Sequence, residues 1–232
     1  MDIVNVSNIV KKFSKNIILN NLSLTVKEGE IIGFIGPSGC GKTTLVKSII
    51  GMEKIDSGYI ELLGEKVPNL QVLNHIGYMA QSDALYEELT GKENLEFFSK
   101  LFKLSKNEIK ARIEYTTKLV NLENELSKKV SNYSGGMKRR LSLAISLIQD
   151  PKLLILDEPT VGIDPKLRFS IWNELKALKA QGKTIIITTH VMDEAEKCDK
   201  LVLIREGIII ASGSVEELKQ KFNVTKIEEI FL

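Results

Sequence analysis

The stretch that decides the fold is residues 29–50, GEIIGFIGPSGCGKTTLVKSII. Its first half contains a short apolar run typical of a strand buried on both faces, and its second half places apolar residues at helical spacing. Gly36, Gly39 and Gly41 lie between the two halves, where a tight loop needs positive φ angles. The sequence therefore predicts a strand, a glycine-rich loop and a helix in direct succession.

The loop itself, GPSGCGKT at residues 36–43, matches the pattern G-x-x-x-x-G-K-[ST] in the context that this pattern requires. Backbone N–H groups and the positive end of the following helix suit such a loop to phosphate oxygens. Lys42 offers a charge to the β and γ phosphates, and the Thr43 hydroxyl is a candidate Mg²⁺ ligand. A glycine-rich turn before a helix is the alternative, but the full pattern favours a nucleoside triphosphate. The predicted binding loop comprises Gly36, Pro37, Ser38, Gly39, Cys40, Gly41, Lys42, Thr43 and Thr44.

The choice of nucleotide depends on a second pattern. The guanine-reading sequence Asn-Lys-x-Asp, which small GTPases carry, does not occur in this sequence. We therefore expect ATP as the nucleotide and Mg²⁺ as its cation.

Composition excludes several other classes of protein. The 232 residues are 43% hydrophobic and 27% charged, which allows a sizeable core. A formal net charge of +2 gives no broad basic surface, so nucleic acid is not an expected partner. Cys40 and Cys198 lie far apart without Cys-x-x-Cys spacing, which argues against a disulfide framework and a zinc site. The sequence shows neither a secretory signal nor an apolar run of the ~18 residues that span a bilayer, so we expect a cytoplasmic protein.

Other apolar runs predict the rest of the architecture. KLLILDEP and KTIIITTH resemble the run before the loop, as expected for parallel strands that end at one edge of a sheet. Residues 3–10 and 22–26 alternate apolar and polar side chains, which predicts antiparallel strands near the start. We expect a single α/β domain with a mostly parallel sheet and an N-terminal antiparallel β-subdomain. Its predicted parts are residues 1–81 and 142–212 for the core, 82–141 for an inserted helical subdomain, and 213–232 for a short C-terminal tail.

Two carboxylates, Asp157 and Glu158, end the apolar run of KLLILDEP. The carboxyl edge of a parallel sheet would place both close to the phosphate loop. Asp157 is suited to hold Mg²⁺, directly or through water, and Glu158 to polarise the attacking water. An Asp-Glu pair before proline can simply cap a turn, but the phosphate loop in the same chain favours the catalytic interpretation.

The segment YSGGMKRRLSLAISLI, from Tyr133, has two interpretations that require the same geometry. In the structural one, Ser134 is a helix N-cap and Gly135 and Gly136 belong to the preceding turn. In the functional one, a capped helix N-terminus with bare glycine backbone receives a γ-phosphate. The two interpretations agree.

This segment resembles the signature motif of ABC ATPases, Leu-Ser-Gly-Gly-Gln, with Tyr133 and Met137 replacing its first and last residues. The resemblance covers nearly the whole chain and keeps the family's motif order. The motifs are Phe13, GPSGCGKT, Gln81 within IGYMAQ, YSGGM, LLILDEP, GIDP at residues 162–165, and His190 after IIITT. The resemblance implies the P-loop NTPase fold and an ATP-hydrolysing subunit that drives a separate transmembrane permease from the cytoplasmic face of the cell membrane.

The resemblance also implies roles for single residues. Phe13 resembles the aromatic residue, usually Tyr, that stacks on adenine. Gln81 resembles the residue that links Mg²⁺ and the attacking water to the helical subdomain and the permease. Asp164 resembles the dimer-contact loop, although Asp-Pro is also an excellent helix start. His190 resembles the histidine that contacts the γ-phosphate and orders the water together with Glu158.

In this family the signature loop of one subunit covers the ATP that the phosphate loop of another subunit holds. Ser134, Gly135 and Gly136 are therefore expected to bind ATP in trans. The chain carries one copy of each motif, so the resemblance implies a second ATP-binding subunit, in a homodimer or in a pair with another such chain.

YSGGMKRRLSLA and THVMDEAEKCDKLVLIREGIIIASGS look most like the export branch, which includes bacterial drug, antibiotic and sodium exporters. The basic residues 138–140 are equally consistent with a solvated helix face. Two alternative functions stay open. The first is a soluble ABC ATPase that acts on ribosomes or DNA. The ribosome-associated kind usually carries two complete motif sets in one chain, whereas this chain has one. The DNA-repair kind has a long coiled coil between phosphate loop and signature, for which the interval from Lys42 to Ser134 is too short. A nucleotide-gated binding switch with little turnover is disfavoured by Glu158 and His190.

Overall fold

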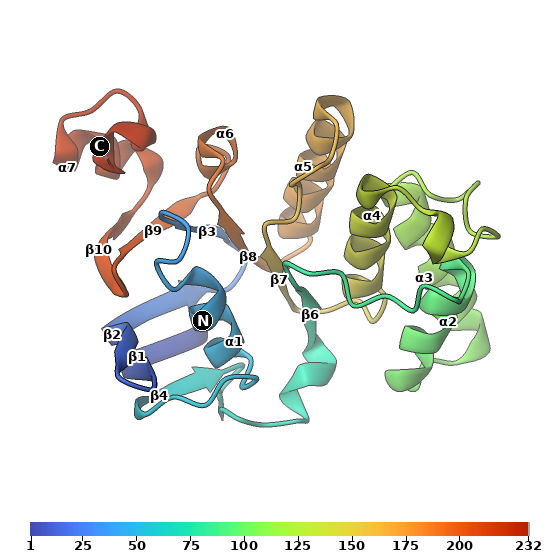
Figure 1. Ribbon diagram of the computed structural model, residues 1–232, viewed down its shortest axis with the longest axis horizontal. Coiled ribbons are helices and arrows are strands. Elements are labelled where there is room, and N and C mark those ends of the chain that lie inside the picture. The colour runs from blue at the N-terminus through green and yellow to red at the C-terminus, as the bar shows by residue number, and fades with distance from the viewer. Residues whose placement is uncertain (232) are drawn as a thin grey trace.

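Two β-sheets organise the computed structural model, which describes residues 1–231 (Figure 1). The six-stranded sheet has the order β10-β9-β3-β8-β7-β6, in which only the pair β10–β9 is antiparallel. The four-stranded sheet, β2-β1-β4-β5, is antiparallel throughout. The strands are β1 (Asp2–Phe13), β2 (Asn16–Lys27), β3 (Ile31–Ile35), β4 (Ser57–Leu62), β5 (Glu65–Lys66), β6 (Ile76–Met79), β7 (Leu153–Asp157), β8 (Thr184–Thr189), β9 (Lys200–Arg205) and β10 (Ile208–Gly213).

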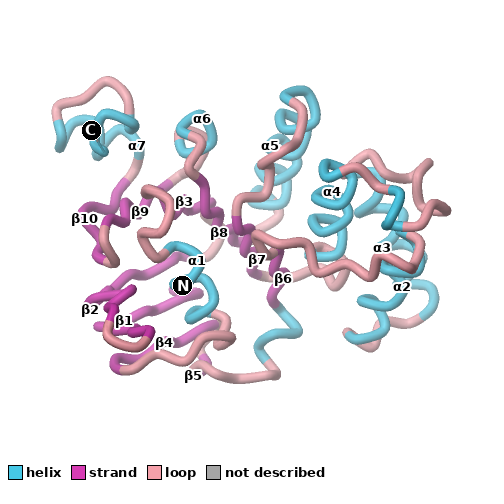
Figure 2. The backbone as a smooth tube through the Cα atoms, viewed as in Figure 1, coloured by secondary structure: helices cyan, strands magenta, loops and turns pink. Residues whose placement is uncertain are grey.

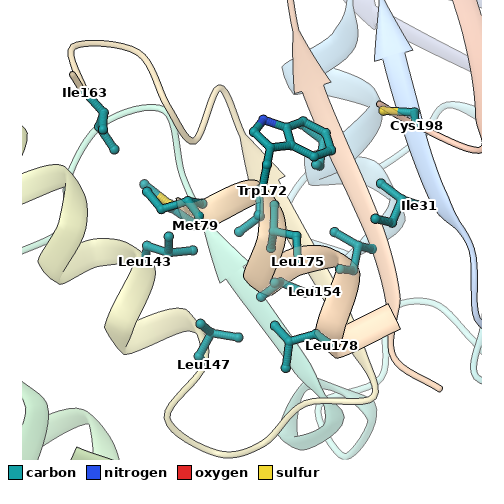
Figure 3. Packing of buried hydrophobic residues seen from close by; sticks show 14 of the residues in the cluster. Ile31, Met79, Leu143, Leu147, Leu154, Ile163, Trp172, Leu175, Leu178 and Cys198 are labelled. Carbon is teal, nitrogen blue, oxygen red and sulfur yellow. The ribbon is translucent and has the colours of Figure 1, made fainter. Parts of the chain in front are cut away.

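The central strands separate two hydrophobic cores. Every residue of β3, β7 and β8 is buried. Since side chains alternate along a strand, Ile32 and Phe34 pack toward the antiparallel sheet, whereas Ile31 and Ile35 belong to the cluster around Trp172 (Figure 3). The predicted α/β class with a mostly parallel sheet is confirmed.

Helices pack around the six-stranded sheet and at one end of it. The α-helices are α1 (Lys42–Ile49), α2 (Gly91–Leu101), α3 (Lys106–Leu119), α4 (Gly135–Ser146), α5 (Pro165–Ala180), α6 (Met192–Ala195) and α7 (Val215–Phe222). The 3₁₀ helices are η1 (Val72–His75), η2 (Val130–Asn132) and η3 (Ile227–Phe231).

Helices α2, α3 and α4 form a group beyond β6, away from the antiparallel sheet (Figure 1). A long loop leads from β6 to α2 (Figure 2). Thr90 and Ser105 begin α2 and α3 with capping boxes, each completed by a Glu in the first turn. The predicted boundary at residue 141 falls inside α4, which continues to Ser146 and joins the helical group to the sheet.

The last residues fold onto the core. Leu218 of α7 and Ile227 of η3 are buried in the cluster that contains Trp172. The predicted short tail is thus a packed element up to residue 231. No helix within residues 1–231 is long and apolar enough to cross a membrane.

Candidate functional site

The phosphate loop connects β3 directly to α1, as the sequence predicts. Gly39 and Gly41 have φ angles of 80° and 106°, in the region that favours glycine. Gly36 does not have a positive φ, so that part of the prediction is wrong. A Cβ atom at Gly36 would lie 2.1 Å from the carbonyl oxygen of Ile204, so close approach to β9 requires glycine there.

Lys42 lies at the start of α1 and is 7% exposed. Its ammonium group donates to the carbonyl oxygens of Gly36 (2.7 Å) and Pro37 (2.9 Å), which holds it inside the loop. Cys40 is buried with its Sγ 3.9 Å from Lys42 Nζ. The first turn of α1 contains no acidic residue, so its positive end is available to an anion.

A cleft of about 270 Å³ opens over this loop. Phe13, Gln81 and Glu158 line the cleft although they come from distant segments of the chain. The loop contributes Ser38, Gly39, Gly41, Lys42, Thr43 and Thr44 to the lining. Phe13 is 46% exposed, and Lys11 Nζ lies over one face of its ring, 4.6 Å from the centroid, so stacking on adenine would use the other face.

Asp157 ends β7 and is 1% exposed. Its Oδ1 accepts a hydrogen bond from the Thr188 hydroxyl, whereas its buried Oδ2 has no partner among residues 1–231. Mg²⁺ usually keeps several waters and takes one or two carboxylates plus substrate phosphates. Asp157 directly precedes Glu158, which lines the cleft together with Thr43. A buried carboxylate with an unused oxygen and a threonine hydroxyl fit that donor set.

The charge of Asp157 also reaches a neighbouring strand. Burial and, to a smaller extent, the charge of Asp157 raise the pKa of Tyr78 to about 12, against the opposing effect of Arg139. Negative and positive charge therefore meet at this end of β6 and β7.

Glu158 is held by two other segments, the end of β8 with the residue that follows it and the loop after β6. Its φ of 52° turns the chain out of β7, and its N–H donates to both the carbonyl and the hydroxyl oxygen of Thr188 (3.1 Å each). Its Oε1 lies 2.9 Å from His190 Nδ1, and its Oε2 accepts from Gln81 Nε2 at 3.3 Å. The structure therefore brings Gln81, Glu158 and His190 together, as the sequence interpretation requires.

The signature segment starts α4. Ser134 is its N-cap and accepts a hydrogen bond from the Met137 N–H (3.3 Å). Gly135 and Gly136 are the first residues of the helix, which corrects their predicted place in the preceding turn. Tyr133 is structural, since it is buried and its hydroxyl donates to the Glu125 carbonyl (2.8 Å).

Asp164 caps α5 by accepting from the Leu167 N–H (3.0 Å), with Pro165 as the first helical residue. The loop before it lies beside the signature segment, because a Cβ atom at Gly136 would be 3.3 Å from the Gly162 carbonyl oxygen. Within one chain, the contacts of Asp164 are those of a residue that starts a helix.

Two functional residues were not identified from the sequence. Arg139 does not lie on a solvated helix face: it is 6% exposed and its guanidinium reaches the ends of β6 and β7. Its position one helical turn before the buried Leu143 could have revealed this. Glu194 is 1% exposed and accepts hydrogen bonds from the hydroxyls of Thr160 and Thr189 (2.8 Å for Thr189), which ties the segment after Glu158 to the one before His190. No sequence pattern indicates that contact.

A glycine-rich phosphate loop, a buried acidic strand end and a glutamate held by a glutamine and a histidine define a class of nucleoside-triphosphate hydrolase with a P-loop core. The model of the ABC transporter family matches residues 19–161. The chain is 44% identical over 214 residues to the Nod factor export ATP-binding protein I of Burkholderia orbicola, covering 91% of the chain and 70% of the relative. The protein of the same name from Rhizobium meliloti is 46% identical over 213 residues, which are 90% of the chain and 64% of that relative.

Solved structures agree with these relatives. An ATP-binding subunit of an ABC transporter matches with a TM-score of 0.91 and 27% identity, covering 99% of the chain and 98% of that structure. A dimeric ATP-binding cassette in a post-hydrolysis state, bound to ADP and Pi, matches with a TM-score of 0.85 and 27% identity over 91% of the chain and 98% of that structure. The chain belongs to the ABC transporter family, whose ATP-binding subunits bind ATP with Mg²⁺ and hydrolyse it.

Proposed function

We propose that this chain hydrolyses ATP in sites shared by two ATP-binding subunits and thereby powers export through a separate transmembrane permease. The proposal rests on the distance between the two predicted phosphate-binding elements, which are the N-terminus of α1 and the N-terminus of α4. Lys42, Thr43 and Glu158 line one cleft, whereas Ser134 begins α4, which lies apart from α1 (Figure 1). A second subunit that presents its own α4 would complete the cleft.

Within one subunit, different residues bind adenine, the phosphates and Mg²⁺. Phe13 stacks on adenine, while the loop N–H groups and Lys42 bind the phosphates. Thr43, Gln81 and Asp157 would hold Mg²⁺, which would neutralise negative charge on the nucleotide.

Glu158 orients the attacking water and accepts its proton as the bond from water oxygen to the γ-phosphorus forms and ADP leaves. His190 and Gln81 fix the direction of the Glu158 carboxylate, since each contacts one of its oxygens. His190 is 49% exposed on its side chain and can therefore also contact the γ-phosphate.

The partner subunit supplies the rest of the site. Ser134, Gly135 and Gly136 present N–H groups and the positive end of α4 to the γ-phosphate held by the other chain. Solved cassettes of the same fold are dimeric, at 27% identity. Asp164 lies in the loop that meets the partner, beside the signature segment. We favour a homodimer because this chain carries every motif, so that two copies of it would complete both sites.

We place the contact with the permease near the loop between β6 and α2, which carries Gln81. Tyr86, in the loop from β6 to α2, packs edge-on against Phe97 of α2 with ring centroids 4.8 Å apart. The two side chains are 48% and 37% exposed. An exposed aromatic pair at the end of the loop that carries Gln81 offers the permease a surface coupled to the hydrolysis site. This contact would keep the chain at the cytoplasmic face of the cell membrane.

The export direction rests on the relatives, which are named for Nod factor export and are 44% and 46% identical to this chain. The test is affinity purification of the tagged chain from detergent-solubilised membranes of its own cells, with identification of the co-purifying proteins. We expect an integral membrane protein that is retained by the wild type and lost from Phe97→Glu, with ATPase activity of the isolated subunit unchanged. Recovery of ribosomal proteins instead, independent of Phe97, would contradict the proposal and support the soluble alternative.

A further inference from the structure

Arg139 connects three parts of the hydrolysis site through its guanidinium group. Nη1 donates to the carbonyl oxygens of Ala80 (2.7 Å) and Gln81 (3.0 Å), at the start of the loop that follows β6. Nη2 donates to the carbonyl oxygens of Asp157 and Glu158 (2.7 Å for Glu158), where β7 ends. The residue itself belongs to α4, the helix that Ser134 begins.

The contacts satisfy a charge that would otherwise be costly to bury. The side chain of Arg139 is 7% exposed, and an unpaired buried charge is strongly destabilising. The guanidinium donates to four carbonyl oxygens, and its Nη1 lies 3.5 Å from Oδ1 of the Asp83 carboxylate. Only the planar fork of arginine has donors in fixed directions for two pairs of carbonyls, because the lysine ammonium is a compact point charge.

The backbone of Glu158 is thereby held from both sides. Its N–H donates to Thr188 on β8, and its carbonyl accepts from Arg139 on α4. Since its φ of 52° takes it out of the strand ladder, these partners replace the contacts that a regular strand would provide. The direction of the Glu158 carboxylate toward Gln81 and His190 follows from this position.

We propose that Arg139 is a positioning residue for hydrolysis: it keeps the backbones of Gln81 and Glu158 in a fixed relation to each other and to the helix that carries Ser134. The inference rests on the proposed role of Glu158 as the group that activates water. The same contacts make the position of α4 important for hydrolysis. A shift of this helix relative to the sheet changes the hydrogen bonds to the carbonyl of Glu158, so that hydrolysis depends on where the helical group lies.

The experiment compares Arg139→Lys with Arg112→Lys. Arg112 is a matched control, since it also clasps two carbonyls of the α4 region, Leu147 and Ile148, and pairs with Asp150 at 3.4 Å, but away from the site. We expect Arg139→Lys to lower the kcat for ATP by about 10- to 100-fold, because a small misplacement of a catalytic group has effects of this size. KM should change by less than about twofold, and Arg112→Lys should change neither constant by more than that.

Adding Arg139→Lys to the Glu158→Gln variant distinguishes an effect on the position of Glu158 from a general effect on the structure. If Arg139 acts through Glu158, Arg139→Lys should change the residual rate of Glu158→Gln by less than about twofold. Arg139→Gln, which keeps one amide donor pair without the charge, serves as the second variant if the lysine protein does not fold. Its kcat should also fall while KM is kept.

An unchanged kcat in Arg139→Lys, an equal loss from Arg112→Lys, or the same fold-loss in both backgrounds would overturn the inference. Wild-type turnover in Glu158→Gln alone would instead contradict the proposed role of Glu158, whatever Arg139→Lys does. The two failures are therefore distinguishable.

Discussion

The N-termini of α1 and α4 have the same electrostatic character but opposite surroundings. Neither helix has an acidic residue in its first turn, whereas α2, α3 and α7 each carry a glutamate there. The N-terminus of α1 is enclosed by its own chain: Lys42 is buried, and a Cβ atom at Gly41 would lie 2.9 Å from Leu19. At α4, Ser134 and Gly135 are exposed, and a Cβ atom at Gly135 would meet nothing within 4 Å.

The difference supports our proposal that one chain carries two halves of a shared site. A helix end with uncompensated positive charge is suited to phosphate at both places. The cleft at the α1 end is lined by Phe13 and by Glu158, the proposed base, and Asp157, the proposed Mg²⁺ ligand, is the residue before Glu158. In the proposed dimer, the exposed α4 end is the element that one subunit offers to its partner.

The largest effect on ATP turnover is expected when the positive charge of Lys42, at the N-terminus of α1, is removed. Lys42→Ala should reduce ATP turnover by about 10³-fold or more, because the phosphates lose their only side-chain cation from the loop. Nucleotide binding should also weaken, as equilibrium dialysis with labelled ATP would show. Near-normal turnover would mean that the loop does not hold the phosphates in this way.

The proposed role of the exposed N-terminus of α4 can be tested with a substitution that should stabilise the helix. Gly135→Glu adds a carboxylate to the first turn of α4, where a side chain has open space, so helix stability should rise by about 0.3–1 kcal/mol. Turnover should nevertheless fall by about 10²-fold, because the added charge repels the γ-phosphate of the partner's ATP.

Lys106→Glu is the control for Gly135→Glu, since it places the same acid in the first turn of α3. Its turnover should equal that of the wild type. Calorimetry and steady-state kinetics of both variants separate the structural effect from the functional one. Full activity in Gly135→Glu would assign Ser134 and the two glycines to helix capping alone.

A smaller effect is expected at the adenine end of the cleft. Phe13→Ala should weaken ATP binding by about 1–3 kcal/mol, which is the range for loss of a base–aromatic stack. Phe13→Tyr should be tolerated because it keeps the ring. The measurement is KM for ATP in both variants, and an unchanged KM in Phe13→Ala would place the adenine contact elsewhere.

Local features of the site were predictable from the sequence, and long-range ones were not. The strand, loop and helix around Lys42 follow from neighbouring residues, as do the caps of α4 and α5 by Ser134 and Asp164. The partners of Arg139 are distant in sequence and meet it only because α4 packs against the ends of β6 and β7. Propensity therefore indicates that Arg139 is helical but not what it binds.

The left-handed backbone of Glu158 and the burial of Glu194 have the same origin. Both depend on hydrogen bonds to threonines at the end of β8, Thr188 and Thr189. These contacts exist only after the parallel strands have aligned. Motif spacing identified Glu158 as a carboxylate near phosphate, but the contacts that orient it required the structure.

We propose that the enclosed N-terminus of α1 and the exposed N-terminus of α4 meet across a nucleotide in two copies of this chain. Glu158→Gln should keep ATP bound while losing most hydrolysis, because the amide cannot accept the proton. Bound ATP then favours the closed dimer, since a ligand shifts the equilibrium toward the state that binds it best. Sedimentation of Glu158→Gln should therefore show dimers with ATP and monomers with ADP, and adding Ser134→Arg should abolish the dimers. A monomer under every condition, or a dimer that survives Ser134→Arg, would contradict the account.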